Sequence, residues 1–293
     1  MKKSISTTLS FLTVLMLVST PAWSVSVNYY LDLNSSLTSL GVTPTDDGIT
    51  GLLSQISFVQ NSVIEQSASG LGGTLVQGDA FTEDGVGYAD GFSYVNPGVD
   101  SEGLDSRYEL TFTFTDLAGT VSSFDLNEVN FNFNNIGTVS AYLSEVNRNI
   151  NIDINDPKPL SDYSNYNDGI KIGEFSVLSG SGNLLLSGPA AGNGGTFLNL
   201  KPIDDSAYYG IWFDSLDRDL FQELQLLTFF FADSTQTALE SDPAFPTDGA
   251  TSYTLLSTGN GGIRANVVPE PSTFLLLGAG LLGIGFIARR KEK

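Results

Sequence analysis

The chain of 293 residues carries 13 Lys and Arg against 33 Asp and Glu, which gives a net charge of −20, and it contains neither Cys nor His. The lack of Cys and His excludes disulfide bonds, Ser-His-Asp and Cys-His catalysis, and the common ligands of zinc, copper and iron–sulfur cofactors. The acidic charge excludes nucleic acid as a partner, because its phosphate groups would be repelled.

Residues 1–24 are predicted to be a secretory signal peptide. Two lysines give a positive start, residues 10–18 form a short apolar stretch, and Ala22 and Ser24 place small residues where a signal peptidase inspects the chain. Cleavage is expected after Ser24. The alternative is an uncleaved membrane anchor at the N-terminus, for which the apolar run is short.

Residues 25–257 are predicted to form an all-β body, a β-sandwich or jelly-roll of about ten strands. Apolar and polar residues alternate repeatedly, as expected for a sheet that is exposed to water on one side. The expected strands are residues 108–114, 129–133, 138–143, 150–154, 170–172, 175–178, 184–187, 196–200, 208–213, 226–232 and 253–256. Glycine-rich turns are expected at residues 116–119, 134–137, 179–182 and 192–195.

Helices are expected only within residues 49–66 and 217–224, and residues 258–268 are predicted to be a spacer that joins the body to the tail. The spacer prediction rests on the Gly-Asn-Gly-Gly cluster at 259–262, which favours an irregular backbone.

A candidate calcium site follows one of the expected strands. Asp153, Asn155 and Asp156 supply the oxygen ligands that Ca²⁺ prefers, although their spacing departs from that of an EF-hand loop. The alternative is an ordinary solvated loop. No other cofactor is expected.

Tyr208 and Trp212 form a candidate carbohydrate-binding pair. In a strand over residues 208–213 they would share one face, where aromatic rings can stack on the apolar faces of sugars. The alternative is that both rings pack in the core.

Catalysis without His and Cys would depend on carboxylates, as in glycoside hydrolysis by a pair of acids. No local arrangement of the acidic residues distinguishes such a pair from a solvated acidic surface. We therefore expect that the protein is not an enzyme, with a carboxylate-based polysaccharide hydrolase as a further alternative.

The tail at residues 269–293 has three consecutive parts. Pro269, Glu270 and Pro271 keep the backbone extended and outside any helix. The 17 residues 272–288 are apolar and would span about 25 Å as a helix, the lower limit for crossing a bilayer. The basic residues that follow, which include Arg289, Arg290 and Lys291, would remain on the cytoplasmic side as a membrane stop.

This order of triplet, span and basic end resembles the PEP-CTERM sorting signal of Gram-negative bacteria. The resemblance implies that an exosortase is a partner and removes the tail after export through the inner membrane. The protein would then be attached to a membrane only before processing, and the body would reach the cell surface or the extracellular matrix. A plain single-span anchor that is never cut is the alternative.

The body is similar to the flocculation-associated PEP-CTERM proteins in residues 81–85, in its glycine-bounded strands and in overall size. This similarity implies extracellular polysaccharide as a partner and a structural role in aggregation, flocculation or biofilm. A calcium-assisted carbohydrate-binding adhesin is the alternative function.

Overall fold

The computed structural model describes residues 25–71, 74–96, 101–146, 152–153, 158–186, 193–223, 226–235 and 252–267. Residues 27–265 form one compact unit, and the other unit consists of residues 1–26 and 266–293. The signal peptide and the sorting tail expected from the sequence lie outside the described residues.

The elements follow in chain order. They are β1 (Val25–Val27), β2 (Tyr29–Leu31), α2 (Asn34–Ser39), β3 (Leu53–Ser67), β4 (Ala80–Tyr94), β5 (Tyr108–Phe124), β6 (Glu128–Phe133), β7 (Thr138–Glu145), the 3-10 helix η2 (Leu160–Asp162), β8 (Ile170–Leu185), β9 (Asn193–Pro202), the 3-10 helix η3 (Ser206–Tyr208), β10 (Trp212–Asp214), β11 (Leu226–Thr235) and β12 (Ser252–Val267).

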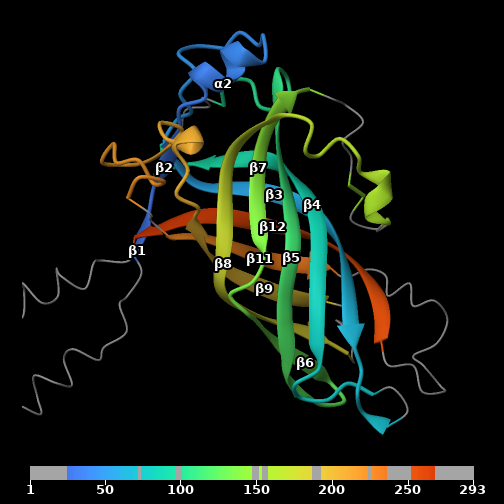
Figure 1. Cartoon of the computed structure of the whole chain (residues 1–293). Helices are drawn as coiled ribbons and strands as arrows, with labels where there is room; N and C mark the ends of the chain where they lie inside the picture. The colour runs from blue at the N-terminus through green and yellow to red at the C-terminus, as the bar shows by residue number, and fades with distance from the viewer. Residues whose placement is uncertain are drawn as a thin grey trace, which may run out of the picture. The chain divides into compact units, whose positions relative to one another are not determined.

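One sheet contains all of these strands, and it closes on itself. Within the unit 27–265 the strand order is β12-β11-β9-β8-β6-β5-β4-β3-β2-β10, and β12 also pairs with β3. That closing pair is antiparallel and runs from Ser252 opposite Ser67 to Ile263 opposite Ile56. In Figure 1, β4, β5 and β7 run side by side, and β9, β11 and β12 cross behind them. The all-β prediction is confirmed, but the sandwich or jelly-roll is wrong because the strands form one sheet, which the pairing of β3 with β12 closes.

The interior of the closed sheet is filled with aromatic side chains. Phe58 and Phe112 are fully buried, with ring centroids 6.0 Å apart. Phe175 packs edge-on against the buried Trp212 at 5.7 Å. Because these rings come from strands far apart in the sequence, their burial stabilises the closed arrangement rather than any single hairpin.

Glycines inside the long strands make room for these rings. Gly119 on β5 lies opposite Phe81 on β4 and Phe133 on β6. A side chain at residue 119 would overlap with the Phe81 ring. The turns predicted at residues 116–119 and 179–182 are therefore wrong: both segments lie inside strands, β5 and β8, and their glycines serve packing across the sheet.

Several other predictions are corrected by pairing between distant segments. The expected helix at 49–66 is largely strand β3, and residues 217–223 form turns rather than a helix. Residues 258–267 are not a spacer, since they continue β12. Of the expected strand at 150–154, only residues 152 and 153 are described, and neither lies in a strand.

A segment at residues 158–168 covers the outer face of β3 and β4. Tyr166 belongs to a small apolar cluster with Val59 and Val86. The Asn61 side chain, which is fully buried, fastens this segment: its Nδ2 donates to the Lys158 carbonyl at 2.8 Å and its Oδ1 accepts from the Lys158 amide at 3.0 Å. The segment 158–168 therefore covers the outer face of β3 and β4.

Candidate functional site

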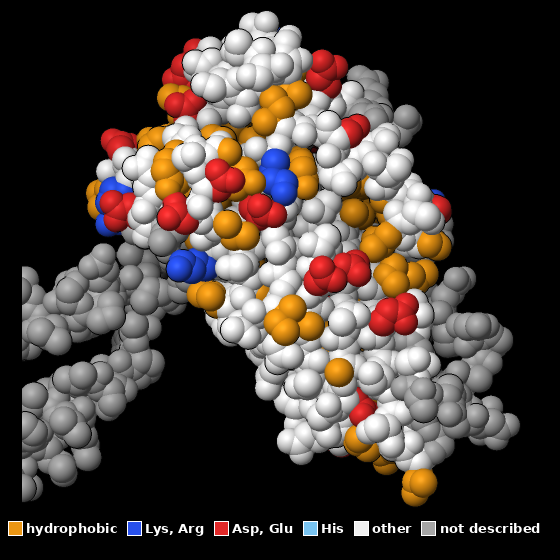
Figure 2. Space-filling model, viewed as in Figure 1, with side chains coloured by type: hydrophobic (Ala, Val, Ile, Leu, Met, Phe, Trp, Pro, Cys, Tyr) orange, Lys and Arg blue, Asp and Glu red, His pale blue; other side chains and the backbone are white. Residues whose placement is uncertain are grey.

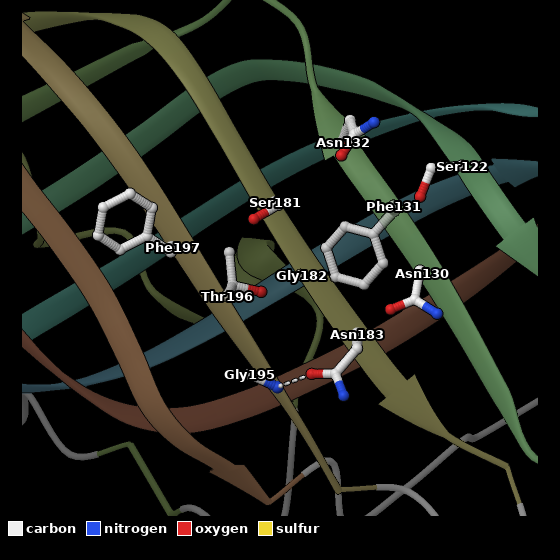
Figure 3. Close-up of a pocket in the computed structure, with 10 residues that line it drawn as sticks. All are labelled: Ser122, Asn130, Phe131, Asn132, Ser181, Gly182, Asn183, Gly195, Thr196 and Phe197. Carbon is white, nitrogen blue, oxygen red and sulfur yellow. Dashed lines mark hydrogen bonds between the residues drawn. The ribbon is translucent and has the colours of Figure 1, made fainter. Parts of the chain in front are cut away.

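A groove of about 490 Å³ crosses β5, β6, β8 and β9, and it is the candidate functional site. Figure 3 shows its lining side chains on adjacent strands. They are Ser122, Asn130, Phe131, Asn132, Ser181, Gly182, Asn183, Gly195, Thr196 and Phe197. We refer to this site as the Asn/Ser groove.

Strand register places the polar groups of the groove in two rows. In one row Asn132 pairs with Ser181, which pairs with Phe197. In the next row Asn130 pairs with Asn183, which pairs with Gly195. Because side chains alternate between the faces of a strand, the groove side chains of both rows lie on one face of the sheet.

Two of the asparagines are held in place by hydrogen bonds. Asn183 Nδ2 donates to Glu128 Oε1 at 2.7 Å, and Asn183 Oδ1 accepts from the Gly195 amide at 3.2 Å (Figure 3). Asn130 Nδ2 donates to Ser123 Oγ at 3.2 Å. These contacts fix the orientation of the amide groups along one side of the groove.

Asn132 and Ser181 are exposed, and within the described part of the chain their side chains make no hydrogen bond. Each therefore presents unused hydrogen-bonding groups to a ligand: an amide donor and acceptor from Asn132 and a hydroxyl from Ser181. Phe197, the next residue in the same row, is 41% exposed, which is high for an aromatic ring.

Phe131 points to the opposite face of the sheet and supports the groove from the interior. Its ring packs edge-on against Phe81 and Phe133, with centroids 5.6 and 5.7 Å away. Gly182 lies directly across from Phe131, and a side chain there would overlap with the ring. The floor of the groove thus depends on a glycine at this position.

A carboxyl with a strongly raised pKa, the half-buried Glu83, lies outside the groove. Glu83 on β4 pairs with Ile64 and Leu117, and burial raises its pKa to about 7, with a smaller contribution from the charge of Asp84. Ser62 opposes this rise in pKa. Because a buried carboxylate is costly to ionise, Glu83 is protonated over a wider pH range than an exposed glutamate.

A pair of acids lies elsewhere on the body. Burial raises the pKa of Asp90, and burial together with the charge of Asp90 raises the pKa of Asp105. Burial raises the pKa of Tyr88, and the charges of Asp90 and Asp105 add to this rise. This group lies outside the groove, and both aspartates remain exposed.

The acidic side chains are dispersed on the face of the body that Figure 2 shows. On the face in Figure 2, Asp and Glu side chains occur singly or in small groups on a surface that is mostly neither charged nor hydrophobic. Lys and Arg side chains are fewer there. Among the described residues on this face, the acidic side chains do not gather into one large patch.

The predicted carbohydrate pair does not form a platform. Trp212 is fully buried, its Nε1 donates to the Ile172 carbonyl at 2.8 Å, and Tyr208 is 6% exposed. The two residues also lie in different elements, η3 and β10. We correct the prediction accordingly: both rings belong to the core, and a sugar has no access to them.

Of the three predicted calcium ligands the structure describes only Asp153, because Asn155 and Asp156 lie outside the described residues. In the part of the chain that is described, no three acidic side chains come together in a way that could hold a metal ion.

The sorting residues Pro269, Glu270 and Pro271, the stop residues Arg289, Arg290 and Lys291, and the cleavage residues Ala22 and Ser24 all lie outside the described residues. None of the described helices has the length and apolar character needed to cross a membrane.

Sequence reasoning did not find the Asn/Ser groove. The alternation in residues 129–133 indicated outward-facing asparagines, which was a usable signal for β6. The polar residues of β8 and β9 were obscured, because the glycines around residues 180–182 and 194–195 suggested turns. Only the register of the three strands brings these side chains together.

Comparison with known proteins gives one match. Residues 267–291 match the family model described as the PEP-CTERM protein-sorting motif. No curated protein and no solved structure matches the chain.

Proposed function

Because its C-terminal motif marks this chain as a PEP-CTERM protein, exported and sorted by an exosortase, we propose that its body is a structural component of an extracellular polysaccharide matrix. The body would bind the polysaccharide through the Asn/Ser groove and thereby contribute to aggregation, flocculation or biofilm.

The observation that carries this proposal is the composition of the groove. Ser181 offers a hydroxyl group beside the exposed Phe197, and Asn132 offers an amide one strand further along the same row. Sugars present hydroxyl groups at their edges and C–H groups on their faces, so amides and hydroxyls can bind the edges while an aromatic ring stacks on a face. The location agrees with the sorting signal, since an exported protein meets polysaccharide at the cell surface.

We also propose that the groove is not a catalytic site. General acid–base chemistry needs groups whose protonation changes during the reaction, and glycoside hydrolysis needs two carboxyls on either side of the scissile bond. The side chains that line the groove are amides, hydroxyls and phenyl rings. This composition supports binding rather than turnover.

The test is sedimentation of the exported protein, purified from its own bacterium, with the polysaccharide of that bacterium. We expect the wild type to sediment with the polymer and the double variant N132A/F197A to stay in solution. F124A is a matched control, because Phe124 is 37% exposed but does not line the groove. Equal sedimentation of all three proteins would show that the groove does not bind the polymer. If the wild type does not sediment with the polymer, the proposal that the body binds the matrix polysaccharide is rejected.

A second candidate function rests on the paired acids outside the groove. Burial raises the pKa of Asp105 and the charge of Asp90 adds to this rise; pairs of carboxyls whose pKa values are set by their surroundings occur in polysaccharide hydrolases. Release of reducing sugar from the matrix polymer by the wild type, and its loss in D90N and in D105N, would support this candidate. No release from that polymer would reject it.

A further inference from the structure

None of the described residues that line the Asn/Ser groove has an ionisable side chain, although the chain has 33 Asp and Glu. The nearest acid in the hydrogen-bond network is Glu128, whose Oε1 accepts from Asn183 Nδ2 at 2.7 Å. That contact uses the carboxylate to orient an amide. The groove is thus an uncharged surface on a strongly acidic protein.

A charged ligand would be unfavourable in this setting. An anionic sugar would place its carboxylate or sulfate in a groove lined by no Lys or Arg, and the net charge of −20 would repel it at low salt. A cationic ligand would be attracted to the protein as a whole but would find no carboxylate among the lining side chains. An uncharged ligand is not repelled by the acidic protein, and it needs no oppositely charged side chain in the groove.

The row Asn132, Ser181 and Phe197 also sets the size of the ligand. These residues lie on β6, β8 and β9, which are adjacent in the sheet. Neighbouring strands are about 4.8 Å apart, so the backbones at Phe197 and Asn132 are separated by about 10 Å across the sheet. One sugar ring cannot stack on Phe197 and also reach Asn132, whereas a chain of linked rings can.

We propose that the Asn/Ser groove selects an uncharged oligosaccharide segment that lies across β6, β8 and β9. One sugar ring stacks on Phe197, and a ring further along the segment exchanges hydrogen bonds with Asn132 and Ser181. Asn130 and Asn183, held by their own hydrogen bonds, border the segment on one side. This inference rests on the proposed function and adds the charge and the minimum length of the ligand.

The experiment uses the exported protein and the polysaccharide of its own bacterium, separated by anion exchange into a neutral and an acidic pool. We expect the protein to bind the neutral pool. The affinity should be the same at about 0.1 M and about 1 M salt, because no charges attract across a groove of this composition. Monosaccharides from a full hydrolysate should compete at least about tenfold more weakly, by concentration of sugar, than short oligomers from a partial hydrolysate.

Two aspartate variants test the site directly. N132D replaces an amide donor with a charge inside the groove, and we expect it to weaken binding to the neutral pool about tenfold. N199D adds the same charge on β9, at an asparagine that does not line the groove, and is expected to bind like the wild type. F197A should weaken binding at least as much as N132D.

Each outcome separates this inference from the proposed function. Preferential binding of the acidic pool, weakened by salt, would overturn the inference and leave the matrix role in place. Equal competition by monosaccharides would overturn the minimum length, and equal binding by N132D, N199D and the wild type would overturn the site. Failure to bind either pool would reject the proposed function together with the inference.

Discussion

Phe131 on β6 and Gly182 on β8 lie opposite each other in adjacent strands, and the Phe131 ring occupies the space that a side chain at residue 182 would need. The same ring packs against Phe81 and Phe133 in the interior. One glycine therefore couples the aromatic core on one side of the sheet to the Asn/Ser groove on the other.

The variant G182A tests this coupling. Its methyl group would displace the Phe131 ring, and we expect the free energy of unfolding to fall by about 1–3 kcal/mol, as is typical of overpacking. Chemical denaturation measures the change. G91A is the control: it lies in β4, and a methyl group there would meet no atom within 4 Å. We expect it to change stability by less than about 0.5 kcal/mol. Equal stability of the two variants would contradict the packing described above.

Trp212 should contribute to stability and not to ligand binding. Its ring stacks near Tyr29 at 6.3 Å and packs edge-on against Phe175. W212A should lower the free energy of unfolding by about 3–5 kcal/mol because it leaves a large cavity. W212F retains a ring but leaves the Ile172 carbonyl without its donor, and it should lower stability by about 1–3 kcal/mol. Both changes are measured by denaturant titration. If W212F remains folded but no longer binds polysaccharide, Trp212 contributes to binding and the prediction is wrong.

Glu83 should make the stability of the body depend on pH. Its pKa is raised from 4.5 to about 7 in the folded protein, so between these values the folded state holds a proton that the unfolded state has released. The free energy of unfolding should therefore decrease as the pH rises from about 4.5 to about 7, and the favourable contribution is lost above that range.

The variant E83Q removes this titration. Relative to the wild type, E83Q should gain stability as the pH rises through the same window, as measured by thermal unfolding at a series of pH values. E65Q on the neighbouring strand is the control, because Glu65 is exposed on the outer face and accepts a hydrogen bond from Thr254 that a glutamine can also accept. A constant difference between E83Q and wild type across the window would contradict a raised pKa.

Asn61 should control the opening of the covering segment at 158–168. N61A removes two hydrogen bonds to the Lys158 backbone and leaves that backbone without its buried partner. We expect faster hydrogen exchange at the Lys158 amide and faster chymotrypsin cleavage after Tyr163, since both require the segment to detach. N199A, which removes an exposed side-chain hydrogen bond to Ser179, is expected to leave both rates unchanged. Unchanged rates in N61A would mean that the apolar contacts of Tyr166 and the hydrogen bond from Thr111 Oγ1 to the Tyr166 carbonyl hold the segment without Asn61.

Some strands could be predicted because the alternation of polar and apolar side chains is set within a single strand. Alternation in residues 108–114 and 129–133 reflects a strand with one face toward a core, and both segments are strands in the structure. The strand β3 was missed, because its side chains pack toward the interior and also under the segment 158–168, so it lacks a clean alternation of polar and apolar residues.

The prediction that Tyr208 and Trp212 bind carbohydrate was wrong for a similar reason. Tyr208 and Trp212 have the spacing of a shared strand face, but their neighbours in space are Glu174, Ile172 and Phe175, which come from β8. Burial is a property of the assembled sheet, so no pattern within residues 208–213 could separate a core tryptophan from an exposed one.

The sequence by itself determined the export signal and the β character of the body. A sorting motif is recognised as a linear order of residues, and alternation follows from the geometry of a single strand, so neither needs distant contacts. Only the tertiary structure decided the closure of the sheet through β3 and β12, the burial of Trp212 and the Asn/Ser groove. These features depend on register between strands that are remote in the chain, and a shift of one residue would turn Asn132 and Ser181 toward the interior.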